Sequence, residues 1–424
     1  MLALVAQNAT GFIDAVMVSH LGDAALASIG IGNFIIILFL TIPLGIGAGT
    51  QVVIARRVGE GNQNILGRDL NLGLIVACFS AALMCLLCKL VAPHLIAAIT
   101  ESDLVLELGM NYVDARLLSI MFIAAFICFR AFWSGKGIFK PIIEALYLML
   151  LFNVIFNYMF IFGHLGAPRL GIYGAGLASA LAAFVCMCFI LIRGWRTYRQ
   201  CGFGSAVPSI RQLQTLIKVS LPECMNLFFI SMAVLALFFI VGQLGVVEMA
   251  ILHVLVNFIL FAHLVVESLG LSAITLVGQS LGRTEYDVAK TFGWLSATVG
   301  ACFVSLVGIM LVLIPESILS LFFDDPISIE VGTIPMQLLG TWIWIDVYAK
   351  VISFALIGAG STKTVLMIMF VLYWCLGIPS QWLLGVRLKY ELAGVFFVPL
   401  VVTLLSSLIF SITWHRGHWK KIMV

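Results

Sequence analysis

Residues 25–55 read ALASIGIGNFIIILFLTIPLGIGAGTQVVIA and contain no acidic or basic side chain. A transmembrane helix needs about 20 predominantly apolar residues, so this stretch is long enough to cross a bilayer. The whole chain has the same character. Of its 424 residues, 62% are hydrophobic and 10% are charged, and the mean hydropathy is +1.15. The sequence therefore predicts an integral membrane protein.

Further apolar runs of spanning length occur along the whole chain. With residues 25–55 included, we predict twelve transmembrane helices over residues 2–20, 25–55, 71–98, 108–132, 142–163, 172–193, 215–243, 247–279, 290–322, 331–357, 364–385 and 392–414. Because hydrocarbon forces each spanning segment to satisfy its own backbone hydrogen bonds, the predicted class is an all-α membrane protein.

Glycines of the first half recur in the second half at one fixed offset, the one that separates Gly22 from Gly245. The pairs at this repeat offset are Gly22/Gly245, Gly47/Gly270, Gly59/Gly282, Gly109/Gly332, Gly135/Gly358, Gly137/Gly360, Gly171/Gly394 and Gly194/Gly417. Chance alone would give about two such pairs, and glycine is placed by backbone need, so the chain is predicted to be a tandem duplication. Six helices per copy return the chain to its starting side, which predicts two parallel-repeat six-helix bundles. We expect an N-terminal lobe over residues 1–195, a cytoplasmic linker over 196–214 and a C-terminal lobe over 215–424.

Basic residues indicate the orientation in the membrane. Of the 23 lysines and arginines, 18 lie in, or within about two helical turns of, the connections after the second, fourth, sixth, eighth and tenth helices or at the C-terminus. By the positive-inside rule these segments are cytoplasmic, which places both termini inside a multi-pass protein of the cell inner membrane. No basic patch is interleaved with aromatic residues, so the lipid bilayer is an expected partner and nucleic acid is not.

Two aspartates interrupt apolar helices. A charged Asp near the centre of a spanning helix costs about 2.5–3.5 kcal/mol on insertion scales, so one that remains usually faces a cavity or an ion path. Asp14 lies in the first predicted helix and Asp346 in the tenth. If the first helix ends early, Asp14 is an interfacial residue reached by water. Lys350 follows Asp346 by four residues, so that pair could instead form an intrahelical ion pair.

Two glutamates are further candidates for this interior chemistry. Glu223 follows Pro222 near the start of the seventh predicted helix, where a carboxylate also suits the positive end of the helix dipole. Glu267 lies late in the eighth predicted helix and has no partner visible in the sequence. For Glu267 the pathway and packing interpretations both stay open.

Several motifs carry a resemblance to a known family. They are Phe12, Ile13 and Asp14; Leu21–Ala27; Arg56–Asn62; Asn153–Tyr158; Phe162–Gly171; Gly174–Ser179; Leu276–Gly282; and Leu356–Gly360. Together these segments resemble the multidrug and toxic compound extrusion (MATE) transporters. The segment from the fifth into the sixth helix is similar to the NorM-like branch in particular.

The resemblance implies a secondary antiporter and not an enzyme. It implies export of amphiphilic, often cationic small molecules in exchange for inward Na⁺ or H⁺, with no other cofactor. Asp14 matches the essential first-helix Asp of the family, and Asn153, Asn157 and Ser179 match polar positions around it. Asp346 matches the Asp of a C-lobe ion site, to which we add Glu223 and Glu267 as candidates. Na⁺ is expected at these same residues if it is the coupling ion, and we expect a monomer.

The chain also departs from the family pattern. NorM-like members carry a glutamate midway along the seventh helix where this chain has Ile230, and Lys350 beside Asp346 could replace or weaken binding of a coupling ion. The partner of Pro222 at the repeat offset falls before Met1, so the first helix is expected to lack opening turns. A flippase for lipid-linked precursors and a membrane-embedded enzyme remain alternative functions.

Overall fold

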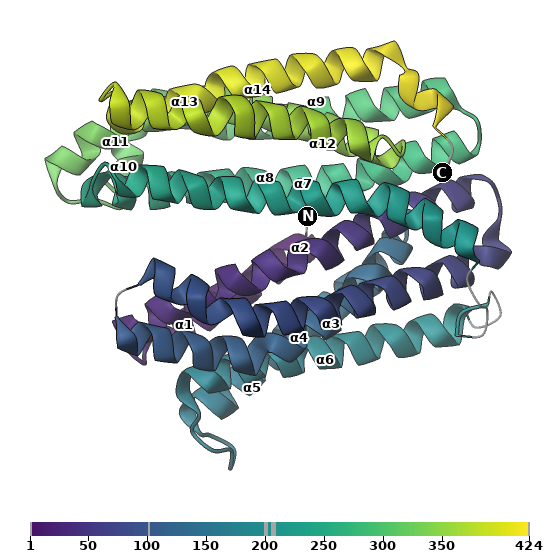
Figure 1. Ribbon diagram of the computed structural model, residues 1–424, viewed down its shortest axis with the longest axis horizontal. Coiled ribbons are helices and arrows are strands. Elements are labelled where there is room, and N and C mark those ends of the chain that lie inside the picture. The colour runs from purple at the N-terminus through teal and green to yellow at the C-terminus, as the bar shows by residue number, and fades with distance from the viewer. Residues whose placement is uncertain (1, 101, 199–201, 205–208, 423–424) are drawn as a thin grey trace. The chain divides into compact units, whose positions relative to one another are not determined.

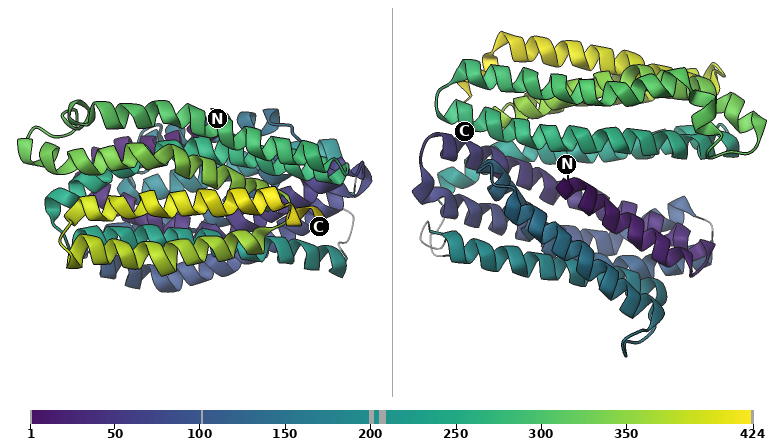
Figure 2. Two further views of the ribbon diagram at one scale, coloured as in Figure 1. Left: turned by 90° about the horizontal axis from the view of Figure 1, so that it is seen from above. Right: turned by 180° about the vertical axis from the view of Figure 1, so that it is seen from behind.

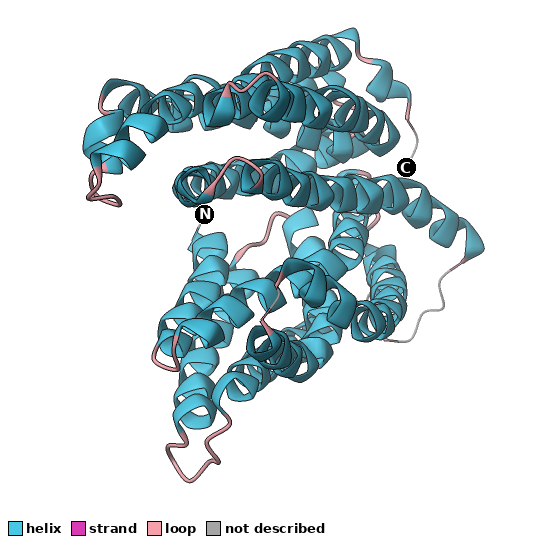
Figure 3. Cartoon of the chain, turned by 60° about the vertical axis from the view of Figure 1, so that its left-hand side comes forward, coloured by secondary structure: helices cyan, strands magenta, loops and turns pink. Residues whose placement is uncertain are grey.

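A computed structural model describes residues 2–100, 102–198, 202–204 and 209–422, without the side chains of residues 2–9, 12, 23 and 246. These described residues are almost entirely helical, and none of them forms a strand (Figure 3). The all-α class predicted from the apolar runs is confirmed.

The long helices of the first copy have the bounds α1 (Leu2–Ser19), α2 (Asp23–Gly59), α3 (Leu66–Ile99), α4 (Asp103–Gly135), α5 (Lys140–Phe162) and α6 (Gly171–Tyr198). The second copy contains α7 (Ile210–Gly242), α8 (Val246–Gly282), α9 (Tyr286–Leu313), the short α10 (Pro315–Leu319), α11 (Pro326–Gly358), α12 (Thr362–Phe370), α13 (Ile378–Trp382) and α14 (Glu391–Arg416). Two π-helical segments, η3 (Val371–Gly377) and η4 (Leu383–Arg387), follow α12 and α13, and short 3-10 turns occur at η1 (Gln63–Ile65) and η5 (His418–Lys421).

Eleven helical spans among the described residues are long and apolar enough to cross a membrane, and α1 adds a helix of 18 residues. Large apolar side chains point outward along them, including Phe79 and Leu313, which are 76% and 73% exposed. Such a surface suits lipid, because a soluble monomer rarely exposes large contiguous apolar patches.

The predicted helix bounds agree within a few residues except in the ninth span. This span was predicted to reach residue 322, but α9 ends at Leu313 and the separate helix α10 begins at Pro315. A proline disfavours the α conformation of the residue before it, and Ile314 has φ −131° and ψ 46°.

The chain forms two compact units, Met1–Leu227 and Phe228–Val424. Within each unit the long helices lie lengthwise beside one another (Figures 1 and 2). In the first unit α4 packs against α2, α3 and α6, and in the second α11 packs against α8, α9 and α14. The apolar windows of α4 and α11 are each 67% buried, more than those of the other spans described, so these two helices form the centres of their bundles.

The duplication is visible in the element bounds. The first residue of α8 lies at the repeat offset from the first residue of α2, and the last residues of these two helices are separated by the same offset. The same holds for α4 and α11. Gly22 and Gly245 precede α2 and α8 with φ values of 104° and 158°, a region that favours glycine. The repeated glycines therefore mark repeated backbone at these helix starts.

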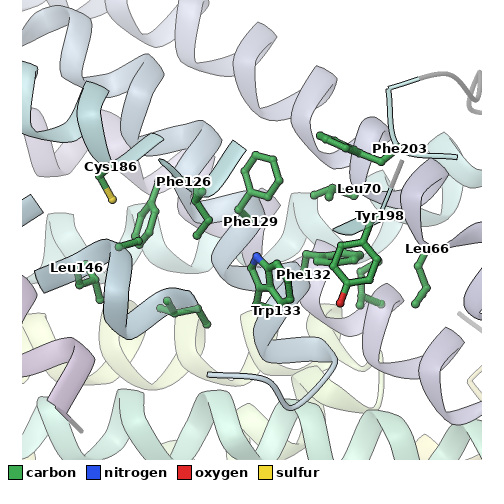
Figure 4. Packing of buried hydrophobic residues seen from close by; sticks show 14 residues of the cluster. Leu66, Leu70, Phe126, Phe129, Phe132, Trp133, Leu146, Cys186, Tyr198 and Phe203 are labelled. Atoms are coloured by element: carbon green, nitrogen blue, oxygen red, sulfur yellow. The ribbon is translucent and has the colours of Figure 1, made fainter. Parts of the chain in front are cut away.

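Aromatic side chains fill the interior of the first unit near the end of α4 (Figure 4). Phe132, Trp133 and Tyr198 form edge-to-face pairs with ring centroids 4.9–5.8 Å apart, and the Lys136 ammonium lies 4.4 Å from the centre of the Tyr198 ring. These contacts fix the end of α6 against α4, and α6 carries one of the site residues described next.

Candidate functional site

The predicted polar residues of the first unit meet at Asp14. The Asp14 side chain is buried on α1, where the residue is 2% exposed. Its Oδ1 accepts hydrogen bonds from Asn153 Nδ2 at 3.0 Å and Asn157 Nδ2 at 2.6 Å, and its Oδ2 accepts one from Ser179 Oγ at 2.7 Å. All four side chains are buried. The structure thus brings Asp14, Asn153, Asn157 and Ser179 into one cluster.

Helix geometry explains how three helices supply this cluster. Asn153 and Asn157 are four residues apart on α5 and therefore lie on one face of that helix. Gly174 lets α6 come close to α5, since a Cβ atom there would clash with the Phe160 carbonyl group. Ser179 follows Gly174 by little more than one turn, so the close approach carries its hydroxyl to Asp14.

The cluster retains an unsatisfied acceptor. Asn153 Oδ1 accepts from Asn157 Nδ2 at 3.2 Å, whereas Asn157 Oδ1 is buried and has no hydrogen-bond donor among the described residues. Buried polar atoms are usually paired, so an orphaned oxygen beside a carboxylate is a place where a cation or a protonated group gains a ligand. Among the described residues, the hydrogen-bond donors that reach Asp14 are all neutral, so none of them carries a charge opposite to that of the carboxylate.

Arg116 is a site residue that sequence reasoning missed. Its guanidinium donates to Asn33 Oδ1 at 2.9 Å and to the Tyr112 hydroxyl, and both Arg116 and Tyr112 interact electrostatically with Asp14. The signal was present, because an arginine inside the apolar run 108–132 is rare in membrane helices.

Asp346 on α11 lies in a different environment in the second unit. Its Oδ2 is 2.7 Å from Lys350 Nζ and 3.9 Å from His263 Nε2, and its Oδ1 accepts from the Tyr373 hydroxyl at 3.4 Å. Lys350 Nζ is also 2.7 Å from His263 Nε2. The intrahelical ion pair that the sequence left open is therefore formed.

A cavity of about 160 Å³ lies beside this group. Its wall combines Asp346, His263 and Tyr373 with apolar side chains such as Ile230 and Val234. Ile230, the residue that takes the place of the expected glutamate, thus faces the same cavity as Asp346. The departure noted in the sequence leaves the wall of this cavity with less negative charge.

The two glutamates lie apart from this arrangement. Glu223 belongs to the first compact unit, is 3% exposed, and accepts from Asn226 Nδ2 at 3.4 Å through its Oε2. Glu267 belongs to the second unit and is exposed on α8, one turn beyond His263. The structure does not group either of them with Asp346 in the lining of the cavity.

The described residues contain no cluster of three or more histidine, cysteine or acidic side chains that could hold a metal ion. The oxygen-rich set around Asp14 instead suits a proton or a hard monovalent cation, because such cations bind carboxylate, amide and hydroxyl oxygens.

Comparisons with known proteins agree with this architecture. A family model described as MatE matches residues 1–159 and 222–383, about three quarters of the chain. The Vibrio cholerae MATE transporter VcmN in its bent form is 18% identical, with a TM-score of 0.86 over 98% of this chain and 94% of that one. A transporter of the MOP superfamily from Pyrococcus furiosus, 17% identical, has a TM-score of 0.84 over the same shares of the two chains. A further MATE structure in the bent conformation, also 17% identical, reaches 0.87 over 98% and 93%.

At these identities the solved structures establish a common fold, and the family model establishes kinship over most of the chain. The buried polar cluster on α1, α5 and α6 and the second, chemically different group around Asp346 lie within this shared fold. The chain is thus a multi-pass membrane transporter that belongs to the MatE family.

Proposed function

We propose that this transporter is a secondary antiporter that exports amphiphilic, often cationic compounds in exchange for inward Na⁺ or H⁺. The observation that carries the proposal is the Asp14 carboxylate, buried and held by three neutral donors. A buried carboxylate is costly unless a positive species compensates it. Arg116 makes its hydrogen bonds to Asn33 and Tyr112, so a mobile cation or a proton can still take the place beside Asp14.

Exchange follows if two positive species compete for one carboxylate. When a proton or Na⁺ occupies Asp14, the attraction for an organic cation is reduced, and departure of the ion restores it. Each species then favours the conformation in which it binds best, which drives alternating access without simultaneous occupancy. Asn153, Asn157 and Ser179 would position the carboxylate and supply oxygens to the ion.

The proposal extends to location and assembly. We place the protein in the cell inner membrane with both termini in the cytoplasm, because most basic turns share one side of the predicted topology. We propose that a monomer is the working unit, since the Asp14 cluster is built entirely from α1, α5 and α6 of one chain.

The decisive experiment measures export of a fluorescent organic cation as its accumulation in inverted membrane vesicles, under a separately imposed Na⁺ or pH gradient. Asp14→Asn removes the charge but keeps the shape, and we expect it to lower gradient-driven transport at least about tenfold, since a charge-assisted hydrogen bond contributes about 1.5–3 kcal/mol. Asp287→Asn is the matched control, because the Asp287 side chain is 98% exposed. Its ion pair with Lys420, 3.5 Å from Oδ1 to Nζ, therefore lies at the surface.

The control variant should transport as the wild type does. The gradient that accelerates efflux identifies the coupling ion. Equal transport by Asp14→Asn and wild type, or efflux that ignores both gradients, would contradict the antiport proposal.

A further inference from the structure

The carboxylate of Asp346 already has a cation, and that cation is part of the protein. Lys350 Nζ lies 2.7 Å from Asp346 Oδ2 and 2.7 Å from His263 Nε2. The Asp346 and Lys350 side chains are 6% and 16% exposed, so this pair is shielded from solvent. Two helices contribute to it, α11 with Asp346 and Lys350 and α8 with His263.

Donor chemistry fixes the roles within this group. A lysine ammonium has donors and no acceptor, so His263 Nε2 must accept, and the imidazole carries its proton on Nδ1. The Tyr373 hydroxyl donates to the other oxygen of Asp346 at 3.4 Å. The ammonium is therefore surrounded by a carboxylate oxygen and an imidazole nitrogen, much as a bound cation would be.

The backbone near Tyr373 differs from an ordinary helix. Tyr373 lies in the π-helical segment η3, whose wider turn displaces side chains relative to an α-helix. Gln381, from α13, lines the same cavity as Tyr373 and Asp346. Among the described residues that line it, Asp346 is the acidic residue and Lys350 and His263 are the basic ones; His263 accepts from the ammonium and is neutral, so the charges of Asp346 and Lys350 cancel.

We propose that Lys350 is a tethered cation that occupies the monovalent-cation site of the second unit. Free Na⁺ is excluded while the ammonium pairs with Asp346, and loss of the ammonium leaves Asp346, Tyr373 and Gln381 as an oxygen-lined Na⁺ site. This inference deepens the proposed function, on which it rests, by restricting exchangeable cation binding to the first unit.

In a simpler interpretation, the Lys350–Asp346 ion pair only lowers the free-energy cost of inserting two charged side chains into the membrane. The two readings differ in what remains when the lysine is shortened. A pair that serves insertion leaves a destabilised carboxylate with no particular affinity for Na⁺. A tethered cation leaves a vacant site that a free cation can fill.

The test measures equilibrium binding of ²²Na⁺ to the purified full-length chain in detergent. The background carries Asp14→Asn, so that the Asp14 carboxylate cannot bind the ion. We expect no saturable Na⁺ binding in this background, and saturable one-site binding once Lys350→Met is added. Adding Asp346→Asn to that double variant should abolish the binding again. Lys350→Arg is the matched control, since it retains the positive charge and should not bind Na⁺.

Lys350→Gln serves as a second variant if methionine impairs folding, which is monitored by size-exclusion profile and unfolding temperature. Failure of folded methionine and glutamine variants to bind Na⁺ would overturn the inference. So would Na⁺ binding by Asp14→Asn with Lys350 intact, if it disappears on adding Asp346→Asn. The binding measurement uses no gradient, so a failure of antiport in the vesicle assay would leave this result standing by itself.

Discussion

At the scale of single residues, Asp14 and Asp346, the aspartates that interrupt predicted apolar helices, have opposite surroundings. Asp14 is held by amide and hydroxyl groups without net charge, whereas Asp346 contacts an ammonium at 2.7 Å. We propose that a free cation can exchange beside Asp14, whereas Asp346 is paired with Lys350 of its own helix. Each unit thus holds a buried aspartate, and the two differ in what can occupy the place beside the carboxylate.

Helix caps differ at equivalent positions of the two copies. Ser102 and Asp325 precede α4 and α11 and are separated by the repeat offset. Asp325 Oδ2 accepts from the Ser328 backbone N–H at 2.8 Å, and Ser102 Oγ accepts from Val105 N–H at 3.5 Å. One cap is charged and the other is neutral, although both satisfy a helix N-terminus.

This difference predicts a pH dependence. Hydrogen bonds from Ser328, first from its side chain and then from its backbone, hold the pKa of Asp325 below its usual 3.8. Because the folded pKa is lowered, the stabilisation by this cap is present above pH 3.8 and is lost as the pH falls through the lower folded value. Asp325→Ala should therefore lower the unfolding temperature at neutral pH, and the difference from wild type should shrink in acid.

Ser102→Ala is the control, because a hydroxyl does not titrate in this range and its effect should stay constant. Intrinsic fluorescence during thermal unfolding at a series of pH values measures both. A deficit of Asp325→Ala that is unchanged at the lowest pH would show that the charge of the cap is not the cause.

At the scale of helices, the two central elements depend on close contacts at glycine. A Cβ atom at Gly358 of α11 would lie 2.7 Å from the Ile274 Cα and 2.9 Å from its carbonyl oxygen on α8. At the equivalent Gly135 of α4, the first contact is the Ile54 Cγ2 at 2.9 Å, followed by the Gln51 carbonyl oxygen at 3.1 Å. Ile274 and Gln51 are themselves separated by the repeat offset, so the same approach occurs in both units.

Gly358→Ala should destabilise the protein by about 1–3 kcal/mol, because helix backbone cannot move aside as a side chain can. Gly135→Ala should cost less, since its first contact is the end of a side chain. Gly30→Ala is the control, because no atom lies within 4 Å of the added carbon, and it should be neutral or slightly stabilising. Unfolding temperatures in one detergent rank the three variants, and a Gly358→Ala protein as stable as Gly30→Ala would refute the packing argument.

The eleventh span shows what an apolar pattern cannot reveal about an element. Residues 364–385 are predicted as one spanning helix, and the structure divides this span into α12, η3, α13 and η4. Hydropathy reports whether a segment can lie in lipid and does not distinguish i+4 from i+5 hydrogen bonding. Tyr373, whose hydroxyl reaches Asp346, lies in the π segment η3.

At the scale of the whole molecule, the chain forms two compact units whose division falls inside α7. Glu223 precedes that division and Ile230 follows it, so one helix serves both units. The lobe boundaries expected from the sequence, with a linker over residues 196–214, stay a prediction. The orientation of the chain in the membrane also stays a prediction and can be tested directly.

We expect a fluorescent protein fused after residue 424 to fluoresce and alkaline phosphatase at the same point to be inactive, because the basic C-terminal segment belongs on the cytoplasmic side. Alkaline phosphatase fused after Asp324, which follows α9 and α10 within an acidic turn, should be active. Active phosphatase at the C-terminus would reverse the proposed topology.

The sequence by itself predicted the class of the protein, the positions of most of its spanning helices and Asp14 as a candidate site residue. The physical reason is that hydrocarbon requires each spanning segment to satisfy its own backbone hydrogen bonds, which a helix does. A carboxylate within such a segment is costly, so one that remains usually faces a cavity or an ion path. Asn153, Asn157 and Ser179 came only from the family resemblance, since nothing in their own spacing points to Asp14.

Only the tertiary structure decided which side chains meet. Arg116 near Asp14, the contact of His263 with Lys350, and Tyr373 reaching Asp346 all join residues of different helices. Such contacts depend on how each helix is rotated, on where glycine lets helices approach and on where a π turn shifts the register. Those quantities are set by packing between segments far apart in the chain, and no pattern within one segment encodes them.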